Sequence, residues 1–155
     1  MVRTTKIEAN LFGVVNVTRA ALPVLRTQRS GTFVQFSSVG GRVGGPPGMG
    51  AYQTAKFAVE GFSEVLANEV KPFGIRVLIV EPGGFRTDWQ GSSMRAARTG
   101  SPGIIVDIVR TPQPPRRLLL GAQAVVMARE AAAVRAAELE QWADISRAAD
   151  FPSEQ

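Results

Sequence analysis

Apolar residues recur at helical spacing over two long stretches of the chain. Between Arg3 and Arg26 they lie mostly three or four positions apart, and a polar segment, residues 27–31, follows, so the pattern predicts a helix with one buried face. The stretch from Ala51 to Lys71 has the same spacing and predicts a second helix, which Pro72 and Gly74 are expected to end. The apolar positions that define the two faces are Ile7, Leu11, Val14, Val15, Leu22 and Leu25 in the first stretch, and Ala55, Val59, Phe62, Leu66 and Val70 in the second.

Two short apolar segments next to these helices have the composition of strands. Thr32 to Ser37 is rich in β-branched and aromatic residues, and it leads into a glycine-rich loop, Gly40 to Gly50. Ile75 to Val80 is a nearly continuous apolar run, which suits a strand that is covered on both faces of a parallel sheet. The order helix, strand, helix, strand with short connections therefore predicts an α/β fold.

The C-terminal part of the chain has a weaker pattern. The stretch 89–115 has no clear period apart from an apolar patch at 104–109, which fits a short helix or a short strand equally. Arg117 to Leu120 is predicted as a last short strand, and the alanine-rich stretch Ala122 to Ala149 as a long, partly exposed helix. The buried contacts of that helix are expected to be Val125, Leu139 and Trp142.

Composition narrows the chemistry that is open to the protein. A chain of 155 residues, 45% of them hydrophobic and 20% charged, fits one globular domain. It contains no cysteine and no histidine, which excludes disulfides, thiolate nucleophiles, Ser-His catalytic pairs and Cys/His zinc sites, and no metal site is expected. Acid–base chemistry must therefore come from tyrosine, lysine, aspartate or glutamate side chains.

The charge distribution bears on partners and location. The chain has 18 Lys and Arg against 13 Asp and Glu, a formal charge of +5, but the arginines are spread along it and Arg116-Arg117 is their one doublet. Without a basic cluster that includes aromatic residues, no nucleic-acid partner is expected. No apolar run reaches the length of a membrane span, and Arg3, Lys6 and Glu8 interrupt any signal peptide, so we expect no membrane partner and a cytoplasmic location.

The most informative polar residues lie at the start of the second helix. Tyr52 is the only tyrosine, and Lys56 follows it at the spacing that puts both on one helix face. A nearby ammonium favours the phenolate form of tyrosine, which suits proton transfer to or from an oxygen. The spacing alone is a weak signal and favours a purely structural role, because a tyrosine and a lysine occur four positions apart by chance in many helices. However, the serine pair Ser37-Ser38 at the end of one strand and the Pro82-Gly83-Gly84 loop at the end of the next are expected at the same edge of the sheet.

Four segments together resemble the consecutive motifs of the short-chain dehydrogenases/reductases. Their order and spacing fit that family over residues 7–90, and the C-terminal part resembles the tail of one bacterial branch of it. The resemblance implies a partial Rossmann-like, doubly wound parallel sheet of two or three strands with flanking helices. The four segments are NLFG at Asn10–Gly13, FSSVGG at Phe36–Gly41, YQTAK at Tyr52–Lys56 and EPGGFRT at Glu81–Thr87.

The resemblance implies an NAD(P)-dependent oxidoreductase that acts on a small alcohol or carbonyl substrate. Tyr52 would be the general acid/base, and Lys56 would lower its pKa and bind the nicotinamide ribose. Ser38, which lies 14 residues before Tyr52 and fits the family spacing better than Ser37, would hold the substrate oxygen. Asn10 would anchor a water molecule in a proton relay to Lys56. The nicotinamide end of the cofactor would also contact the backbone of Pro82, Gly83 and Phe85 and the hydroxyl of Thr87.

The chain departs from the family pattern in two places. No glycine-rich phosphate-binding turn of the form TGxxxGxG precedes Asn10, so binding of NAD or NADP is expected to be weakened or lost. The segment 90–115 is shorter than the segment that covers the substrate in the family. The sequence is interpreted as a single domain, 1–155, that contains the catalytic half (3–90), a shortened substrate segment and a C-terminal strand and helix (116–150).

These departures predict exposed surface and two alternative functions. The strand at Thr32–Ser37 is expected to lie at the edge of the sheet and to leave apolar surface that favours self-association. The two helices at 3–26 and 51–71 match a subunit interface of the family, so a homo-oligomer, most simply a dimer, is expected. The chain is then an oxidoreductase or, alternatively, a non-catalytic remnant of the family that acts as an oligomerisation or regulatory module.

Overall fold

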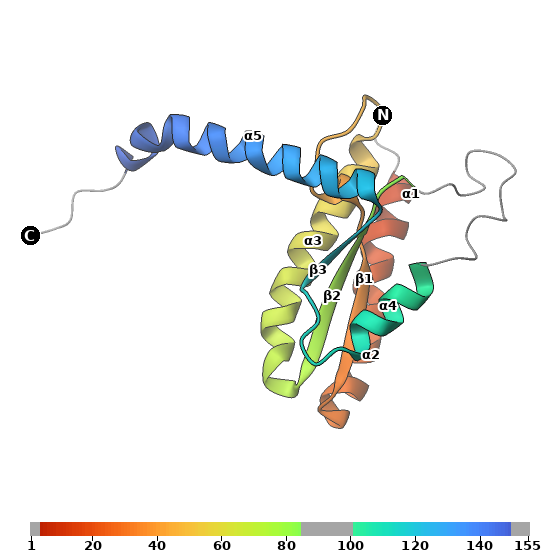
Figure 1. Ribbon diagram of the computed structural model, residues 1–155. Helices are drawn as coiled ribbons and strands as arrows, with labels where there is room; N and C mark the ends of the chain where they lie inside the picture. Colours follow the sequence, from red (N-terminus) through yellow and green to blue (C-terminus); the bar gives the residue numbers. More distant parts are fainter. Residues whose placement is uncertain (1–3, 85–100, 150–155) are drawn as a thin grey trace, which may run out of the picture.

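Three parallel strands form one sheet (Figure 1). The computed structural model describes residues 4–84 and 101–149 of the chain. Strand β1 (Gly31–Phe36) pairs with β2 (Ile75–Pro82), which pairs in turn with β3 (Arg117–Leu120). The predicted α/β class is confirmed, and within these described ranges β1 is an edge strand, as expected.

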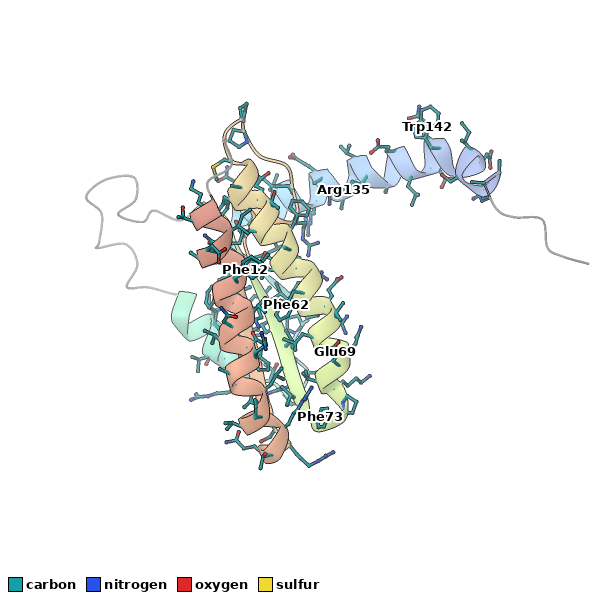
Figure 2. All side chains as sticks on the ribbon, turned by 180° about the vertical axis from the view of Figure 1, so that it is seen from behind. Phe12, Phe62, Glu69, Phe73, Arg135 and Trp142 are labelled. Atoms are coloured by element: carbon teal, nitrogen blue, oxygen red, sulfur yellow. The ribbon has the colours of Figure 1, made fainter. Side chains whose placement is uncertain are left out.

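Helices cover both faces of the sheet. Figure 1 shows α2 (Gly13–Gln28) and α3 (Gly50–Val70) on one face and α4 (Ser101–Arg110) on the other. Seen from the opposite side in Figure 2, α2 and α3 run next to each other across the sheet. A short 3-10 turn, η3 (Lys71–Phe73), follows α3, and Gly74 adopts a left-handed conformation (φ 69°) as the chain enters β2. The predicted ending of this helix at Pro72 and Gly74 is thus confirmed.

Strand β2 is the centre of the core. Its side chains alternate between the two faces. Ile75, Val77 and Ile79 are buried beneath α2 and α3, whereas Leu78 and Val80 are buried on the face that α4 covers. Burial on both faces explains why this strand is a continuous apolar run in the sequence.

The apolar patch at 104–109, for which the sequence allowed either a helix or a strand, lies in helix α4. Ile105, Ile108 and Val109 pack against the sheet, and their spacing places them on one helical face. Ile104 and Val106, on other faces of the turn, are each 46% exposed. The side chains that contact the sheet therefore recur with the helical period.

The first predicted helix contains a change of helical type. It runs as α1 (Thr4–Ile7), a π-helical turn η1 (Glu8–Phe12) and then α2, and the N–H of Gly13 donates to the carbonyl oxygen of Glu8. All six apolar positions predicted for its inner face are half-buried. The predicted apolar face is therefore confirmed. The apolar pattern did not indicate the π turn, which inserts one extra residue into the helix.

The last helix, α5 (Ala122–Arg147), projects away from the sheet (Figure 1). The prediction that Leu139 and Trp142 are among its buried contacts is wrong, because their side chains are 70% and 51% exposed. Val125 is half-buried. The buried residues are instead Ala124 and Ala128, near the start of the helix.

The first half of α5 packs against the body of the protein, most closely at its start. Ala124 packs with Val39 and Val43 of the loop after β1. A Cβ atom added to Gly83 would lie 3.1 Å from the Cβ of Ala124. The approach requires a small residue on each segment, Gly83 after β2 and Ala124 on α5. The residues that α5 buries are therefore alanines and not its large apolar side chains.

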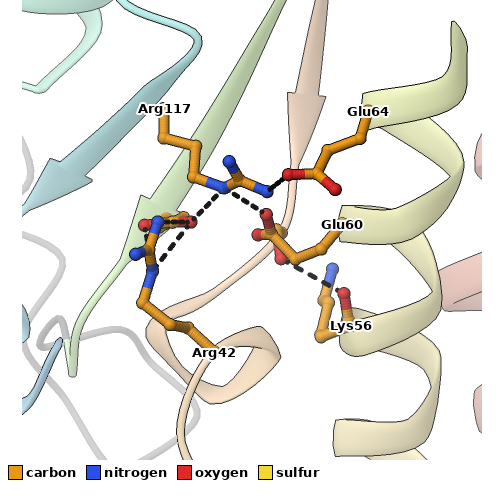
Figure 3. A network of polar contacts seen from close by, with 7 residues as sticks. Arg42, Lys56, Glu60, Glu64 and Arg117 are labelled. Atoms are coloured by element: carbon orange, nitrogen blue, oxygen red, sulfur yellow. Dashed lines mark hydrogen bonds and ion pairs between the residues drawn. The ribbon is translucent and has the colours of Figure 1, made fainter. Parts of the chain in front are cut away.

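An ion-pair network joins β2 to its neighbours (Figure 3). The carboxylate of Glu81 is fully buried, and Arg42 Nη2 lies 2.8 Å from its Oε1 atom while Arg42 Nε lies 3.2 Å from both oxygens. Arg117 Nε lies 3.4 Å from Glu81 Oε1 and 3.0 Å from Glu60 Oε2, and Arg117 Nη2 donates to Glu64. The network connects the loop after β1 with β2, β3 and α3.

None of the helices in the described part of the chain is long and apolar enough to cross a membrane. Across residues 4–84 and 101–149, no three acidic side chains are grouped as ligands for a metal ion.

Replacing Gly41 by alanine is expected to destabilise the fold. Its added Cβ would lie 2.9 Å from the carbonyl oxygen of Lys56 and 2.5 Å from Ser37 Oγ, so the backbone of α3 or of the loop must move. We expect Gly41→Ala to lower the free energy of unfolding by about 1–3 kcal/mol in a urea titration. Gly44→Ala is the control, because no atom lies within 4 Å of its added Cβ. Equal losses in the two variants would contradict this reading.

Removing Arg42, which pairs with Glu81, is expected to destabilise the protein in a pH-dependent way. Burial raises the pKa of Glu81 above its ordinary value, and the hydrogen bonds from Arg42 oppose that rise. A carboxyl whose folded-state pKa is raised costs stability as pH rises from the unfolded pKa to the folded one, and Arg42→Met widens this window. We expect a loss of about 3 kcal/mol at pH 8 and a smaller loss at pH 5, measured by urea unfolding.

The control for this prediction is the double variant Arg42→Met with Glu81→Gln. It has no carboxylate left to titrate at the end of β2, so its stability relative to the wild type is expected to change less between pH 5 and pH 8. A loss in Arg42→Met that is independent of pH would rule out the burial of a charged Glu81 as its cause.

Candidate functional site

Three segments meet at the carboxyl ends of β1 and β2. Phe36 ends β1 and lies opposite Val80 of β2, so Ser37 and Ser38 leave the sheet beside Pro82. A 3-10 turn, η2 (Val39–Gly41), then leads the chain towards the start of α3. This edge is where parallel α/β sheets place ligands, because the connecting loops splay apart there.

Ser38 faces this edge and is half-buried. It caps the η2 turn, because its Oγ accepts a hydrogen bond from the N–H of Gly40 at 3.1 Å. The same hydroxyl donates to the carbonyl oxygen of Pro82 at a long 3.4 Å. A bond of this length is weak, so the hydroxyl proton is available to a better acceptor.

Ser37 points the opposite way, as consecutive residues of an extended chain do. Its hydroxyl is buried and donates to the carbonyl oxygen of Lys56 at 3.3 Å. Ser37 therefore fastens the end of β1 to α3, whereas Ser38 lies at the open edge. The preference for Ser38 over Ser37 rests on this difference as well as on its spacing to Tyr52.

Lys56 is a buried amine in the middle of this arrangement. Its residue is 9% exposed, and its Nζ donates to the carbonyl oxygen of Phe36 at 2.9 Å. Burial lowers the pKa of Lys56 from its ordinary value. An ammonium has three N–H donors, and the Phe36 carbonyl accepts one of them, which leaves donors for a ligand.

Tyr52 lies between the amine and the serine. Lys56 Nζ is 5.8 Å from the centroid of the Tyr52 ring, within the range of a cation–π contact. A Cβ atom added to Gly40 would lie 3.7 Å from Tyr52 Cε1 and 3.5 Å from Ser38 Oγ. The Tyr52 ring and the Ser38 hydroxyl thus flank the same glycine, and the fold brings Ser38, Tyr52 and Lys56 together.

Asn10 lies on the π-helical turn η1. Its Nδ2 donates to the carbonyl oxygen of Lys6 at 3.0 Å, and its side chain is half-buried. The turn packs against α3, the helix that carries Tyr52 and Lys56. Within the described part of the chain, Asn10 makes no direct hydrogen bond to either of them. It therefore lies on a turn that packs against the helix of Tyr52 and Lys56, without a hydrogen bond to either side chain.

The proposed cofactor contacts after β2 are described only in part. Pro82 is the last residue of β2, and its carbonyl faces Ser38. The N–H of Gly83 already donates to the carbonyl oxygen of Leu120 at 2.9 Å, so it is not a donor available to a ligand in this arrangement. Phe85 and Thr87 lie outside the described residues.

The ion-pair residues around Glu81 were not identified from the sequence. A carboxylate at the end of the apolar run Ile75 to Val80 was a usable signal, because a buried charge needs an oppositely charged partner. Its partner Arg42 lies 39 positions away and comes from a glycine-rich loop, so the pairing itself had no local signature.

Comparison with known proteins agrees with the arrangement of these segments. Residues 3–98 match the family model described as short chain dehydrogenase. The oxidoreductase BOA17 of Botryotinia fuckeliana (strain B05.10) is 44% identical over 170 residues, which cover 92% of this chain and 62% of that protein. A 3-ketodihydrosphingosine reductase of Bacteroides thetaiotaomicron is 46% identical over 95 residues, 61% of this chain and 35% of the relative.

Solved structures show the same similarity. A short-chain dehydrogenase from Streptomyces avermitilis has a TM-score of 0.81 and 38% identity, and covers 94% of this chain and 62% of its own. A short chain dehydrogenase from Burkholderia cenocepacia J2315, solved in complex with NADP, has a TM-score of 0.66 and 27% identity over 87% of this chain and 56% of its own.

The matches are extensive on the side of this chain and partial on the side of the relatives. The chain spans 62% of the length of both BOA17 and the Streptomyces protein. The alignment with BOA17 also covers more positions, 170, than the 155 residues of this chain, so that relative has residues within the aligned region that have no counterpart here. The match of the family model to well over half of the chain nevertheless establishes that the protein belongs to the short-chain dehydrogenase family of oxidoreductases.

Proposed function

We propose that the protein is an NAD(P)-dependent oxidoreductase that interconverts an alcohol and a carbonyl compound, with Tyr52 as the general acid/base. The observation that carries the proposal is the buried amine of Lys56, 5.8 Å from the centre of the Tyr52 ring, next to a hydroxyl of Ser38 at the open edge of the sheet. An amine buried in this way has a structural cost, which a catalytic role would explain.

The residues present fit the nicotinamide end of such a cofactor. Lys56 keeps N–H donors that the Phe36 carbonyl does not use, and these suit the hydroxyls of a ribose. The backbone at Pro82 lies at the same edge. Weakened binding of the cofactor stays a prediction from the sequence, in which no TGxxxGxG turn precedes Asn10.

When bound, a nicotinamide cofactor supplies or accepts the hydride. In the reducing direction, the Ser38 hydroxyl donates a hydrogen bond to the carbonyl oxygen of the substrate, and the Tyr52 hydroxyl transfers its proton to that oxygen. The charge of Lys56 stabilises the phenolate that remains on Tyr52. Asn10 holds a water molecule that returns a proton towards Lys56. The oxidation of the alcohol follows the same steps in reverse.

The substrate class rests on this chemistry and on the relatives. One relative is named as a 3-ketodihydrosphingosine reductase, which is consistent with a carbonyl group as the reacting centre. The candidate residues described above serve the nicotinamide end of the cofactor, whereas NAD and NADP differ at the adenosine ribose, so the proposal includes both. The NADP bound to the Burkholderia protein is an observation on that protein.

A second candidate is a non-catalytic module of the same family that acts through oligomerisation or regulation. The engaged N–H of Gly83 and its close packing against Ala124 favour it, because they leave less room for a ligand at the end of β2. Binding of cofactor separates the two candidates. Undetectable binding of both NADH and NADPH at millimolar concentration, in a fluorescence titration, would leave only this second candidate.

Self-association is proposed for either function. Apolar side chains are exposed on the helices that cover one face of the sheet. Phe12 on η1, labelled in Figure 2, is one of them, and Val17 on α2 and Val65 on α3 are two others. Val17 and Val65 are 71% and 57% exposed. Burial of such positions against a second copy of the chain would remove apolar surface from water.

Replacement of Tyr52 by phenylalanine tests the catalytic proposal. The variant keeps the ring beside Lys56 but has no proton to transfer, so we expect turnover to fall by about 10²–10⁴-fold while cofactor binding changes little. Turnover is measured by the absorbance of the reduced nicotinamide with a panel of ketones and aldehydes. Ser37→Ala is a matched control, because that hydroxyl faces away from the edge. Full turnover by the Tyr52→Phe variant would exclude Tyr52 as the acid/base.

Light scattering at micromolar concentration tests self-association. We expect a dimer for the wild type and a monomer for the double variant Val17→Glu with Val65→Glu, because charged side chains resist burial at an interface. Leu139→Glu, an equally exposed position on α5, is the control and is expected to remain dimeric. A monomeric wild type would refute the proposed dimer.

A further inference from the structure

An open cavity lies where the η2 turn meets parts of α3, β3 and α5. It is about 240 Å³ in volume. This is smaller than the usual pocket for a drug-sized ligand, so it suits a small ion or molecule. Its lining residues are Gly41, Arg42, Phe57, Glu60, Arg117 and Arg135.

Three guanidinium groups from three separate elements reach this cavity. Arg42 follows η2, Arg117 begins β3, and Arg135 is on the part of α5 that leaves the body (Figures 2 and 3). Arg42 and Arg117 use Nε and Nη2 for the carboxylates around Glu81. Within residues 4–84 and 101–149, neither Nη1 group bonds to an acceptor, and Arg135 forms no hydrogen bond or ion pair. Donors are therefore available from three directions.

The cavity also has one carboxylate on its wall. Glu60 is 8% exposed, and its Oε2 accepts from Arg117 at 3.0 Å. Its Oε1 is buried and has no hydrogen-bond partner in the described part of the chain. A buried acceptor in this state is costly. When the Glu60 carboxylate turns this oxygen towards the cavity, a ligand that brings a proton satisfies it.

We propose that this cavity binds inorganic phosphate in its monohydrogen form. A tetrahedral oxyanion offers acceptor oxygens in several directions, which matches guanidinium groups that come from three elements, whereas a planar carboxylate offers two oxygens in one plane. The hydroxyl of the monohydrogen ion donates to the free oxygen of Glu60. Sulfate has the same shape and charge but no proton at neutral pH, so Glu60 repels it.

Bound phosphate would also join α5 to the body of the protein. The buried residues of α5 are Ala124 and Ala128, and Met127 and Ala131 pack beside them. Arg135 lies one turn beyond these contacts. An anion held by Arg42, Arg117 and Arg135 links this exposed part of α5 with η2 and β3. The proposal does not depend on cofactor binding, so its failure and the failure of the oxidoreductase proposal are separate results.

Titration calorimetry of the whole chain, in a buffer free of phosphate and sulfate and at fixed ionic strength, tests the proposal. At pH 7.5 we expect phosphate to bind at least about tenfold more tightly than sulfate, a difference of about 1.4 kcal/mol. Methyl phosphate, a monoester that is mostly a dianion at this pH and has no hydroxyl on its ester group, is expected to bind as weakly as sulfate, since it has no proton to donate. Equal affinity for phosphate and sulfate would overturn the proposal. So would the absence of phosphate binding at concentrations up to about 10 mM.

Two variants locate the site. Arg135→Gln is on an exposed part of α5 and is expected to fold normally and to weaken phosphate binding about tenfold, the effect of losing one charge-assisted hydrogen bond. Arg129→Gln makes the same change on the same helix outside the cavity, and is expected to leave binding unchanged. Equal effects of the two variants would identify non-specific attraction and overturn the proposed site. Glu60→Gln, whose amide can donate to sulfate, is expected to reduce the preference for phosphate over sulfate.

Discussion

The buried carboxylate of Glu81 is the constraint on which the arrangement of the segments depends. It lies at the carboxyl end of the central strand with no exposure to solvent, so it requires cationic partners. Arg42 and Arg117 supply them, from the loop after β1 and from β3. Because Arg117 also contacts Glu60 of α3, the charge of Glu81 links the loop after β1, strand β3 and helix α3 at the end of β2. That loop and α3 also carry the candidate catalytic residues.

A second constraint is the close contact between the loop after β1 and α3. The backbone of Gly41 approaches the carbonyl of Lys56 so closely that no side chain fits there. That carbonyl accepts from Ser37, while the amine of the same lysine donates to Phe36. One residue of α3 is therefore bonded to the end of β1 through both its backbone and its side chain. This double attachment holds the amine in a buried position beside Tyr52, against the cost of its desolvation.

The described structure combines a dense core with exposed peripheral segments. The core surrounds β2, whereas the edge of β1 and the outer part of α5 are exposed. Leu139 and Trp142 on α5 are exposed, and the arginine-lined cavity lies beside the earlier part of that helix. Both the exposed apolar side chains and the arginines are places where a partner or ligand can contribute contacts that the chain itself does not make.

The sequence by itself determined the elements and the candidate residues whose signals are local. The helical period of the two long stretches, the apolar run of β2 and the short strands predicted the α/β sheet, because burial on one or both faces imposes a period on nearby positions. The spacing of Ser38, Tyr52 and Lys56 predicted a site that the fold brings together. Only the tertiary structure decided the π turn at Asn10, the helical state of α4 and the exposure of Leu139 and Trp142. It also decided the pairing of Arg42 with Glu81 and of Arg117 with Glu60, which lie 39 and 57 positions apart, because contacts between distant segments leave no periodic trace in the chain.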